Sequence, residues 1–223
     1  NIFAKDISMV RRILHIALPN GIEDGLFQLA KVALSSIVAM FGTAQIAAYG
    51  ISQNFWAMGA LFPVAMGPAF ITVIGQYMGA RDIDGANYYM EKLLRFTYAG
   101  GVVWSFSFTV ISPLILLVYS LTEETRGLII LLIVLHNVFN ALLAPCAFPL
   151  SSGLRAAGDV KFTMFAAIFS TVICRVTFSV LFGIILDMGV VGVTVAMVID
   201  WCVKAALIFR RYRSRKWTAF RVI

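Results

Sequence analysis

Two charged residues lie inside long apolar segments of this chain. Arg175 falls within the segment 166–186, and Asp200 falls within the segment 190–209. Each segment has the roughly 20 residues that a helix needs to cross a bilayer. An ionised side chain near the middle of a membrane is costly, and it usually persists because it is paired or because it serves a transport pathway. These charges therefore predict a membrane protein in which buried charge has a structural or a transport role.

The two charges are expected at the same depth in the membrane. The turn Asp-Met-Gly separates the segments, with Arg175 thirteen residues before Met188 and Asp200 twelve residues after it. At about 1.5 Å per residue, the hairpin brings the two side chains level. Lys204 lies one turn from Asp200, and its long side chain can also reach toward the cytoplasm. We interpret Arg175, Asp200 and Lys204 as a structural intramembrane charge group, with a coupling site as the alternative.

A better placed acid occurs in the first apolar segment. Glu23 lies eleven residues past Arg12, or about 16 Å along a helix, near the middle of the membrane. It shares one helical face with Lys31, eight residues further on, whereas Asp24 points roughly 100° away. A carboxylate at that depth suits reversible protonation or, with oxygen neighbours, Na⁺ binding. The alternative is a structural role, in which Glu23 pairs with a lysine or caps freed backbone groups. We predict Glu23, with Asp24 and Lys31, as substrate or ion-coupling residues.

A second polar group occurs in the fourth apolar segment. His136 and Asn140 lie one helical turn apart, with Asn137 beside them, and His136 lies about 13 Å inward from Gly127. Histidine can gain and lose a proton near neutral pH, which suits transport. Hydrogen bonding between helices is the alternative for all three residues. We predict them as polar groups of a transport cleft.

The elements that must position these residues are apolar helices. Hydrophobic residues make up 61% of the 223 residues and charged residues 13%, which excludes an ordinary soluble domain. The chain therefore predicts an all-α membrane protein with one six-helix domain over 1–223. Prolines and glycines in the second span predict a broken or kinked helix, and 151–159 predicts a cytoplasmic loop. The predicted spans are 13–40, 47–78, 93–119, 127–150, 161–186 and 190–209.

The basic residues predict the orientation. Of the 18 lysines and arginines, fourteen fall on one side of the predicted spans, one (Arg126) falls on the other, and three lie within spans. The positive-inside rule then places both termini in the cytoplasm. The basic tail 210–223 fits an anionic membrane leaflet better than a nucleic acid. We expect the lipid bilayer as a partner and no nucleic acid.

Catalytic and metal sites are not expected. The two histidines are far apart, no Ser/His/Asp or Cys/His set is clustered, and the three cysteines all fall within spans without metal-ligand spacing. We therefore expect a protein that is not an enzyme and that has no metal or cofactor. Because the chain begins with Asn1 rather than Met, we also expect a piece of a longer protein.

Several segments together resemble the C-terminal lobe of the multidrug and toxic-compound extrusion (MATE) family. Their order and spacing cover nearly the whole chain. They are Leu18-Pro-Asn-Gly-Ile-Glu-Asp-Gly-Leu-Phe27, Ile46-Ala-Ala-Tyr-Gly50, Gly75-Gln-Tyr-Met-Gly-Ala80, Leu154-Arg-Ala-Ala-Gly-Asp159, Arg175, Gly189-Val-Val-Gly192, Asp200-Trp201 and Arg213-Ser-Arg-Lys-Trp217.

The resemblance implies a transporter of twelve helices in two six-helix lobes, of which this chain supplies the second. Family members export drug or metabolite cations by alternating access, driven by H⁺ or Na⁺. Glu23 is the nearest counterpart of the family's carboxylate on the seventh helix. In the sodium-coupled branch that acid lies further along, where this chain has Phe27 or Gln28. The acid on the tenth helix of that branch is also missing here, so the resemblance favours H⁺.

These expectations combine into one function. We expect the C-terminal half of a cation-coupled antiporter that exports small, amphipathic, cationic compounds, working with a missing N-terminal lobe. The expected location is the plasma membrane, as a multi-pass protein of the bacterial inner membrane. One alternative is a flippase of the wider superfamily that moves lipid-linked saccharides, which requires a cleft rich in basic groups. Another is a truncated fragment that does not transport.

Overall fold

The computed structural model describes residues 7–220, with the side chains of residues 21–220 and those of Leu14 and Leu18. Over these residues every regular element is a helix, so the predicted all-α fold is confirmed. Lys5 and Arg221, two of the basic residues used to predict orientation, lie outside the described residues. The elements are α1 (Ile7–Ala39), α2 (Thr43–Gly59), α3 (Leu61–Gly79), α4 (Ile83–Leu116), α5 (Glu123–Ala147), α6 (Pro149–Ala156), α7 (Val160–Ile168), η1 (Phe169–Arg175), α8 (Val176–Ser179), η2 (Val180–Ile185), α9 (Gly189–Arg213) and η3 (Lys216–Ala219).

The predicted break in the second span lies at Ala60, the one residue between α2 and α3. Pro63 is the third residue of α3 and has no N–H to donate to the carbonyl group of Gly59. Gly59 itself packs against α5, because a Cβ atom there would lie 2.3 Å from Oδ1 of Asn137. The break and the glycine together let α2 change direction where it meets α5.

The predicted loop over 151–159 is wrong in its bounds. Residues 149–156 form α6, which follows α5 after the single residue Phe148. Pro149 interrupts the helical hydrogen bonds at this point and then starts α6, where its missing N–H is not needed. The true turn is confined to 157–159, where Gly158 has a φ of 96°. One consequence is that Arg155 lies on a helix instead of a loop.

The fifth span is continuous but contains two wide turns. The α-helical segments α7 and α8 alternate with the π-helical segments η1 and η2, from Val160 to Ile185. A π turn inserts an extra residue and often marks a functional region of a helix. Here η1 ends at Arg175, the buried charge of the span.

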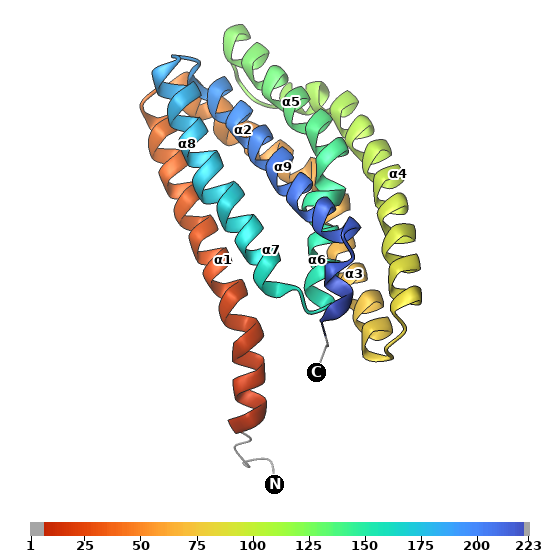
Figure 1. Cartoon of the computed structure of the whole chain (residues 1–223). Coiled ribbons are helices and arrows are strands. Elements are labelled where there is room, and N and C mark those ends of the chain that lie inside the picture. Colours follow the sequence, from red (N-terminus) through yellow and green to blue (C-terminus); the bar gives the residue numbers. More distant parts are fainter. Residues whose placement is uncertain (1–6, 221–223) are drawn as a thin grey trace.

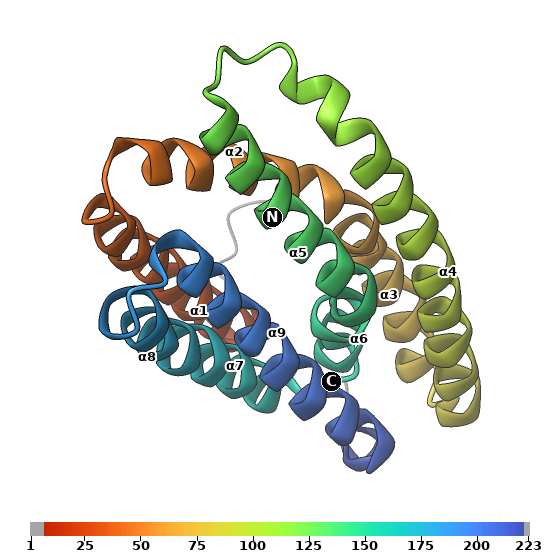
Figure 2. The ribbon, with the colours of Figure 1, turned by 90° about the horizontal axis from the view of Figure 1, so that it is seen from above.

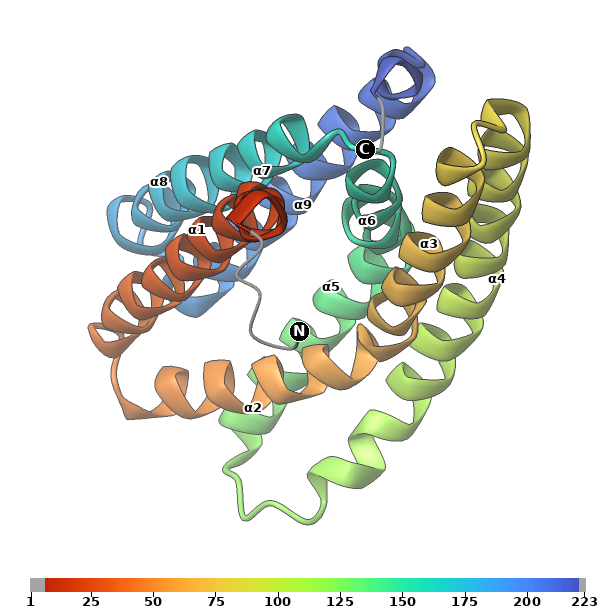
Figure 3. The ribbon, with the colours of Figure 1, turned by 90° about the horizontal axis from the view of Figure 1, so that it is seen from below.

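The helices form two groups that meet along α9 (Figure 1). In one group α1 packs against the segment from α7 to η2, and α9 packs against that segment as well. In the other group α3, α4, α5 and α6 pack together around a shared apolar core. Viewed from above, α2 crosses from α1 to the second group, and α5 lies beside α9 (Figure 2). The view from below shows α6 and α7 joined by a short turn near the end of α9 (Figure 3).

An ion pair fixes that turn to α9. Asp159 is 2% exposed, and its Oδ2 lies 2.5 Å from Nε of Arg211, while Oδ1 lies 3.2 Å from Nη2. The two parallel contacts give the pair a defined geometry. Arg211, which sequence analysis assigns to the basic tail, therefore also holds the end of α9 against the rest of the fold.

Five helical stretches of the described residues are long and apolar enough to cross a membrane: 61–79, 83–116, 123–156, 160–185 and 189–213. They correspond to the second half of the second predicted span and to the four spans that follow. The first predicted span, 13–40, lies in α1, which is not among these five stretches. The turns at 80–82 and 157–159 and the end of α9 lie at one end of the molecule, and the turns at 117–122 and 186–188 lie at the other (Figure 1). The predicted grouping of the connecting segments agrees with this arrangement.

Candidate functional site

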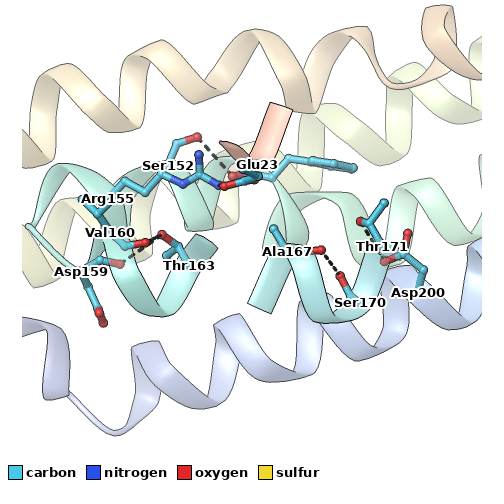
Figure 4. Close-up of polar contacts among 11 residues, drawn as sticks. Glu23, Ser152, Arg155, Asp159, Val160, Thr163, Ala167, Ser170, Thr171 and Asp200 are labelled. Carbon is cyan, nitrogen blue, oxygen red and sulfur yellow. Dashed lines mark hydrogen bonds and ion pairs between the residues drawn. The ribbon is translucent and has the colours of Figure 1, made fainter. Parts of the chain in front are cut away.

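Glu23 of α1 forms an ion pair with Arg155 of α6, and the two side chains point toward each other (Figure 4). Nη2 of Arg155 donates to both carboxylate oxygens, at 2.6 Å from Oε1 and 2.7 Å from Oε2. The Glu23 side chain is 14% exposed and that of Arg155 is 26% exposed. A charge-assisted contact in this half-buried setting is stronger than a neutral hydrogen bond. It joins two helices that belong to different groups of the fold.

Two cavities border this ion pair, and we call them together the Glu23 cavity. Glu23, Phe148 and Lys204 line both of them. The first also has Asp24 and Phe27 of α1 and Thr171 of η1 in its wall. The second is completed by residues of α3, α5 and α6, namely Val64, Gly67, Ala147, Pro149, Ser151, Ser152 and Arg155. Carboxylates, cations and aromatic rings therefore line two neighbouring cavities between α1, α3, α6, η1 and α9.

Lys204 faces the Glu23 cavity. Its Nζ lies 5.1 Å from the centre of the Phe148 ring, a distance that allows a cation–π contact. No ion pair joins Lys204 to Asp200 among the described residues, although the two lie one turn apart on α9. Lys204 thus shares a cavity with the predicted coupling residues Glu23 and Asp24.

Arg175 and Asp200 lie together between η1 and α9. Nη1 of Arg175 is 3.8 Å from Oδ2 of Asp200, and the side chains are 7% and 2% exposed. Thr171 donates a hydrogen bond of 3.4 Å to Oδ1 of Asp200, as Figure 4 shows, and Nη2 of Arg175 contacts Sδ of Met197. The chain thus brings together the two charges that the hairpin places at one depth. Their role as a structural pair stays a prediction.

The polar residues of α5 lie elsewhere. His136, Asn137 and Asn140 are buried, and none of them lines the Glu23 cavity. Nδ1 of His136 lies 2.7 Å from the carbonyl oxygen of Leu132, and Nδ2 of Asn137 donates to Oγ1 of Thr109 on α4 at 2.9 Å. The Asn137 contact is the hydrogen bond between helices that was the alternative for this group. Their predicted transport role is untested.

The structure adds residues that sequence reasoning did not assign to the site. Arg155 is the direct partner of Glu23, Phe148 contacts Lys204, and Thr171 connects the Asp200 carboxylate with the wall of the Glu23 cavity. From the sequence, Arg155 is predicted to be one of the cytoplasmic basic residues. Pro149 is the sequence signal that points to a helix at Arg155. A proline often occupies the first position of a helix, so the residues after Pro149 could have been predicted as helical.

Lys31 lies outside the Glu23 cavity. It is exposed, and its Nζ lies 4.9 Å from the centre of the Phe27 ring. It lines a third cavity together with Arg175, so the predicted coupling residues on α1 divide between two spaces. Over the described residues, no three His, Cys, Asp or Glu side chains are grouped as a metal site would require.

This arrangement defines a class of protein. Long apolar helices enclose charged and aromatic residues around an internal cavity, as in a multi-pass membrane protein that passes small molecules through its interior. The family model described as MatE matches residues 19–181, which is more than half of the chain. The chain belongs to the MatE family, whose members are transporters.

Similar proteins agree with this assignment. The uncharacterized transporter YisQ of Bacillus subtilis is 26% identical over 214 residues, which is 93% of this chain and 46% of that protein. The structure of a MATE protein in complex with MaL6 has a TM-score of 0.84 at 19% identity, covering 92% of this chain and 46% of the other. A MOP superfamily transporter from Pyrococcus furiosus, described as having a binding pocket of reverse polarity, has a TM-score of 0.83 at 21% identity, covering 94% and 46%. This chain therefore spans about half the length of the relatives it matches.

Proposed function

We propose that this chain is the C-terminal lobe of a proton-coupled exporter of small amphipathic compounds, with Glu23 as the coupling carboxylate. The observation that carries the proposal is the Glu23–Arg155 ion pair in the wall of an internal cavity. Membership of a transporter family and a length about half that of the relatives support the lobe assignment. H⁺ is preferred to Na⁺ because the acids of the sodium-coupled pattern are missing from this sequence.

Glu23 would couple proton uptake to a change of shape through its partner. While Glu23 is ionised, Arg155 holds α1 against α6. Protonation removes the charge on the carboxylate and weakens that contact, so α1 and α6 are released from each other. A ligand or proton shifts a conformational equilibrium only when it binds the two states with different affinity, and breaking this contact supplies such a difference. The inward-open and outward-open states would then exchange around the same cavity.

The lining of the Glu23 cavity supports an amphipathic substrate. Phe27 and Phe148 offer apolar surface, and the carboxylates of Glu23 and Asp24 would attract a cationic group. The other half of the binding cleft would come from the N-terminal lobe. The whole protein would lie in the bacterial plasma membrane with both ends of this lobe in the cytoplasm, as the distribution of basic residues indicates.

The test is transport by the full-length parent protein in vesicles. A pH gradient should drive efflux of a fluorescent organic cation such as ethidium, and Glu23→Gln should slow it about tenfold or more, because the variant cannot change charge. The matched control is Glu91→Gln, which removes an acid from an exposed ion pair on the surface of α4. Unchanged pH-dependent transport by the Glu23→Gln protein would exclude Glu23 as the coupling residue.

A purely structural role for Glu23 makes a different prediction. If the carboxylate served only to hold Arg155, then Arg155→Gln would slow transport as much as Glu23→Gln, and both variants would keep the pH profile of the wild type. If Glu23 carries the proton, the Glu23→Gln protein loses the pH dependence, whereas the Arg155→Gln protein keeps a weaker one, because its Glu23 can still change charge beside Lys204. Measuring initial efflux rates across a range of internal pH values separates the two.

A further inference from the structure

The third cavity lies between α1, α2 and η1, and we call it the Lys31 cavity. It lies beside the Glu23 cavity, because Phe27 lines both. Lys31 is eight residues beyond Glu23 on the same face of α1, or about 12 Å along the helix. The residues that line it are Phe27, Lys31, Ser35, Tyr49, Gln53, Asn54, Trp56, Ala57 and Arg175.

The charges of this cavity are of one sign. Lys31 and Arg175 contribute two cations, and none of the described residues that line it carries a carboxylate. Lys31 takes part in none of the ion pairs formed by the described residues. The remaining polar groups are amides and hydroxyls from Ser35, Tyr49, Gln53 and Asn54, which can donate hydrogen bonds. The lining thus suits a negatively charged group.

Two buried donors in the wall lack hydrogen-bond partners. Nε of Arg175 has none, although the guanidinium group also faces Asp200 at 3.8 Å on α9. Nε1 of the Trp56 indole ring has none either, and its ring stacks on Trp201 at a centre-to-centre distance of 5.7 Å. A buried donor without a partner is unfavourable. Because both atoms are covered by their neighbours, a ligand would accept from them only after the Arg175 or Trp56 side chain shifts toward the cavity.

We propose that the Lys31 cavity binds the anionic group, a carboxylate or a phosphate, of an amphipathic compound whose apolar part lies against Phe27 and Trp56. The proposal rests on the transport function above and names one part of its substrate. A compound with an acidic group at one end and a basic group at the other would use both cavities, with its cation near Glu23 and Asp24. The charged residues that line the Lys31 cavity are both cations, and a substrate with only a positive charge would give them no partner.

The test is equilibrium binding to the full-length parent in phosphatidylcholine nanodiscs, without any gradient. The probes are naphthylacetate and naphthylethanol, which share the aromatic ring and differ in charge, measured by isothermal titration calorimetry at neutral pH. We expect the acid to bind about tenfold more tightly than the alcohol, because only the acid pairs with Lys31 and Arg175. Equal affinities for the two probes would overturn the proposal.

Variants that keep both Arg175 and Asp200 assign the binding to this cavity. Lys31→Gln should weaken naphthylacetate binding about fivefold, as expected for loss of one partly exposed ionic partner. Lys31→Arg should restore it, and Ser35→Asp, which adds a carboxylate to the wall, should weaken it as well. Lys161→Gln, at an exposed site near the start of α7, is the matched control and should bind like the wild type. Unchanged binding by the Lys31→Gln protein would show that the acid binds elsewhere.

A second set of nanodiscs separates two sources of the anion. If the natural occupant is a lipid phosphate, adding phosphatidylglycerol should lower the affinity for naphthylacetate in the wild type but not in the Lys31→Gln protein. If it is a free carboxylate, the affinity should be the same in both kinds of nanodisc. Because binding is measured at equilibrium, a failure of Glu23 as the coupling residue leaves this result unaffected.

Discussion

At the scale of single residues, two of the ion pairs that join helices have very different surroundings. Arg175 and Asp200 are almost completely buried and 3.8 Å apart, whereas Glu23 and Arg155 are in direct contact at the edge of a cavity. A buried charge is strongly unfavourable when its partner is removed, and a pair beside a cavity can exchange its partner for water or a ligand. The first pair therefore suits stability, and the second suits a change of state.

This difference predicts the effect of removing Asp200. Asp200→Ala leaves the Arg175 guanidinium group buried without a carboxylate, which should lower stability by about 3–5 kcal/mol. The measurement is thermal unfolding of the full-length parent in detergent, followed by loss of its monodisperse fraction. Arg175→Ala should be similarly unstable for the converse reason. Asp24→Ala, at an exposed acid of α1, is the control and should unfold near the wild-type temperature.

A charge exchange tests whether the pair acts as a unit. The double variant Arg175→Asp with Asp200→Arg restores opposite charges between η1 and α9, so it should recover part of the stability lost in either single variant. Similar instability in the double variant and the single variants would show that these residues are held by their other contacts and not by each other.

At the scale of elements, the junction of α2 and α3 is fixed by its contact with α5. Gly59 lies at the end of α2, and a Cβ atom at this position would overlap Oδ1 of Asn137, 2.3 Å away. Asn137 is 2% exposed and donates to Thr109 on α4, so it cannot move without breaking that hydrogen bond. One side chain of α5 thus holds α2 and α4 in place together.

Gly59→Ala should therefore destabilise the protein by about 1–3 kcal/mol, the usual cost of overpacking a buried position. The effect should shrink when Asn137 is also replaced by Ala, because the shorter side chain leaves room for the new methyl group. A double-mutant cycle on thermal unfolding measures this coupling. Gly50→Ala is the control, since a Cβ atom there meets nothing within 4 Å. Additive effects of Gly59→Ala and Asn137→Ala would contradict the proposed contact.

The sequence predicts the helices well because most spans are long and apolar and their connections carry charge and turn residues. It also predicts the break in the second span, where proline and glycine have direct effects on a helix. The end of the fourth span is not predictable from the sequence, because Pro149 is compatible both with the end of one helix and with the start of another. For this reason the contact of Arg155 with Glu23 is not predicted, because the direction of a side chain in a loop cannot be derived from helical periodicity.

Contacts between distant segments are the part that local patterns do not reach. Equal depth along one hairpin is a local argument, and it brings Arg175 near Asp200. No such argument connects Glu23 with Arg155, which is 132 residues away. The split of α1 between two cavities also depends on the position of α2, and that position follows from tertiary packing at Ala60 and Gly59.

At the scale of the whole molecule, one surface of the lobe suits lipid. The outer face of α4 exposes a band of large apolar residues, including Val103, Phe106, Val110 and Leu114, each 60–71% exposed. The charged cavities lie on the side of α1 and α9, so they are separated across the fold from this face of α4. This separation is what a lobe needs when one side meets lipid and the other meets a second lobe.

The direction of the lobe in the membrane is then a prediction that can be measured. Its basis is the excess of basic residues at the end that holds the turn 80–82 and the end of α9, which should face the cytoplasm. Single cysteines would be introduced into a cysteine-free full-length parent in intact cells and treated with a membrane-impermeant maleimide. Glu124→Cys and Met188→Cys, both exposed at the opposite end, should be labelled from outside, while Asp84→Cys and Ser214→Cys should react only after the cells are opened. Labelling of Ser214→Cys in intact cells would reverse the orientation, and it would place the Glu23–Arg155 pair on the outer half of the transport path.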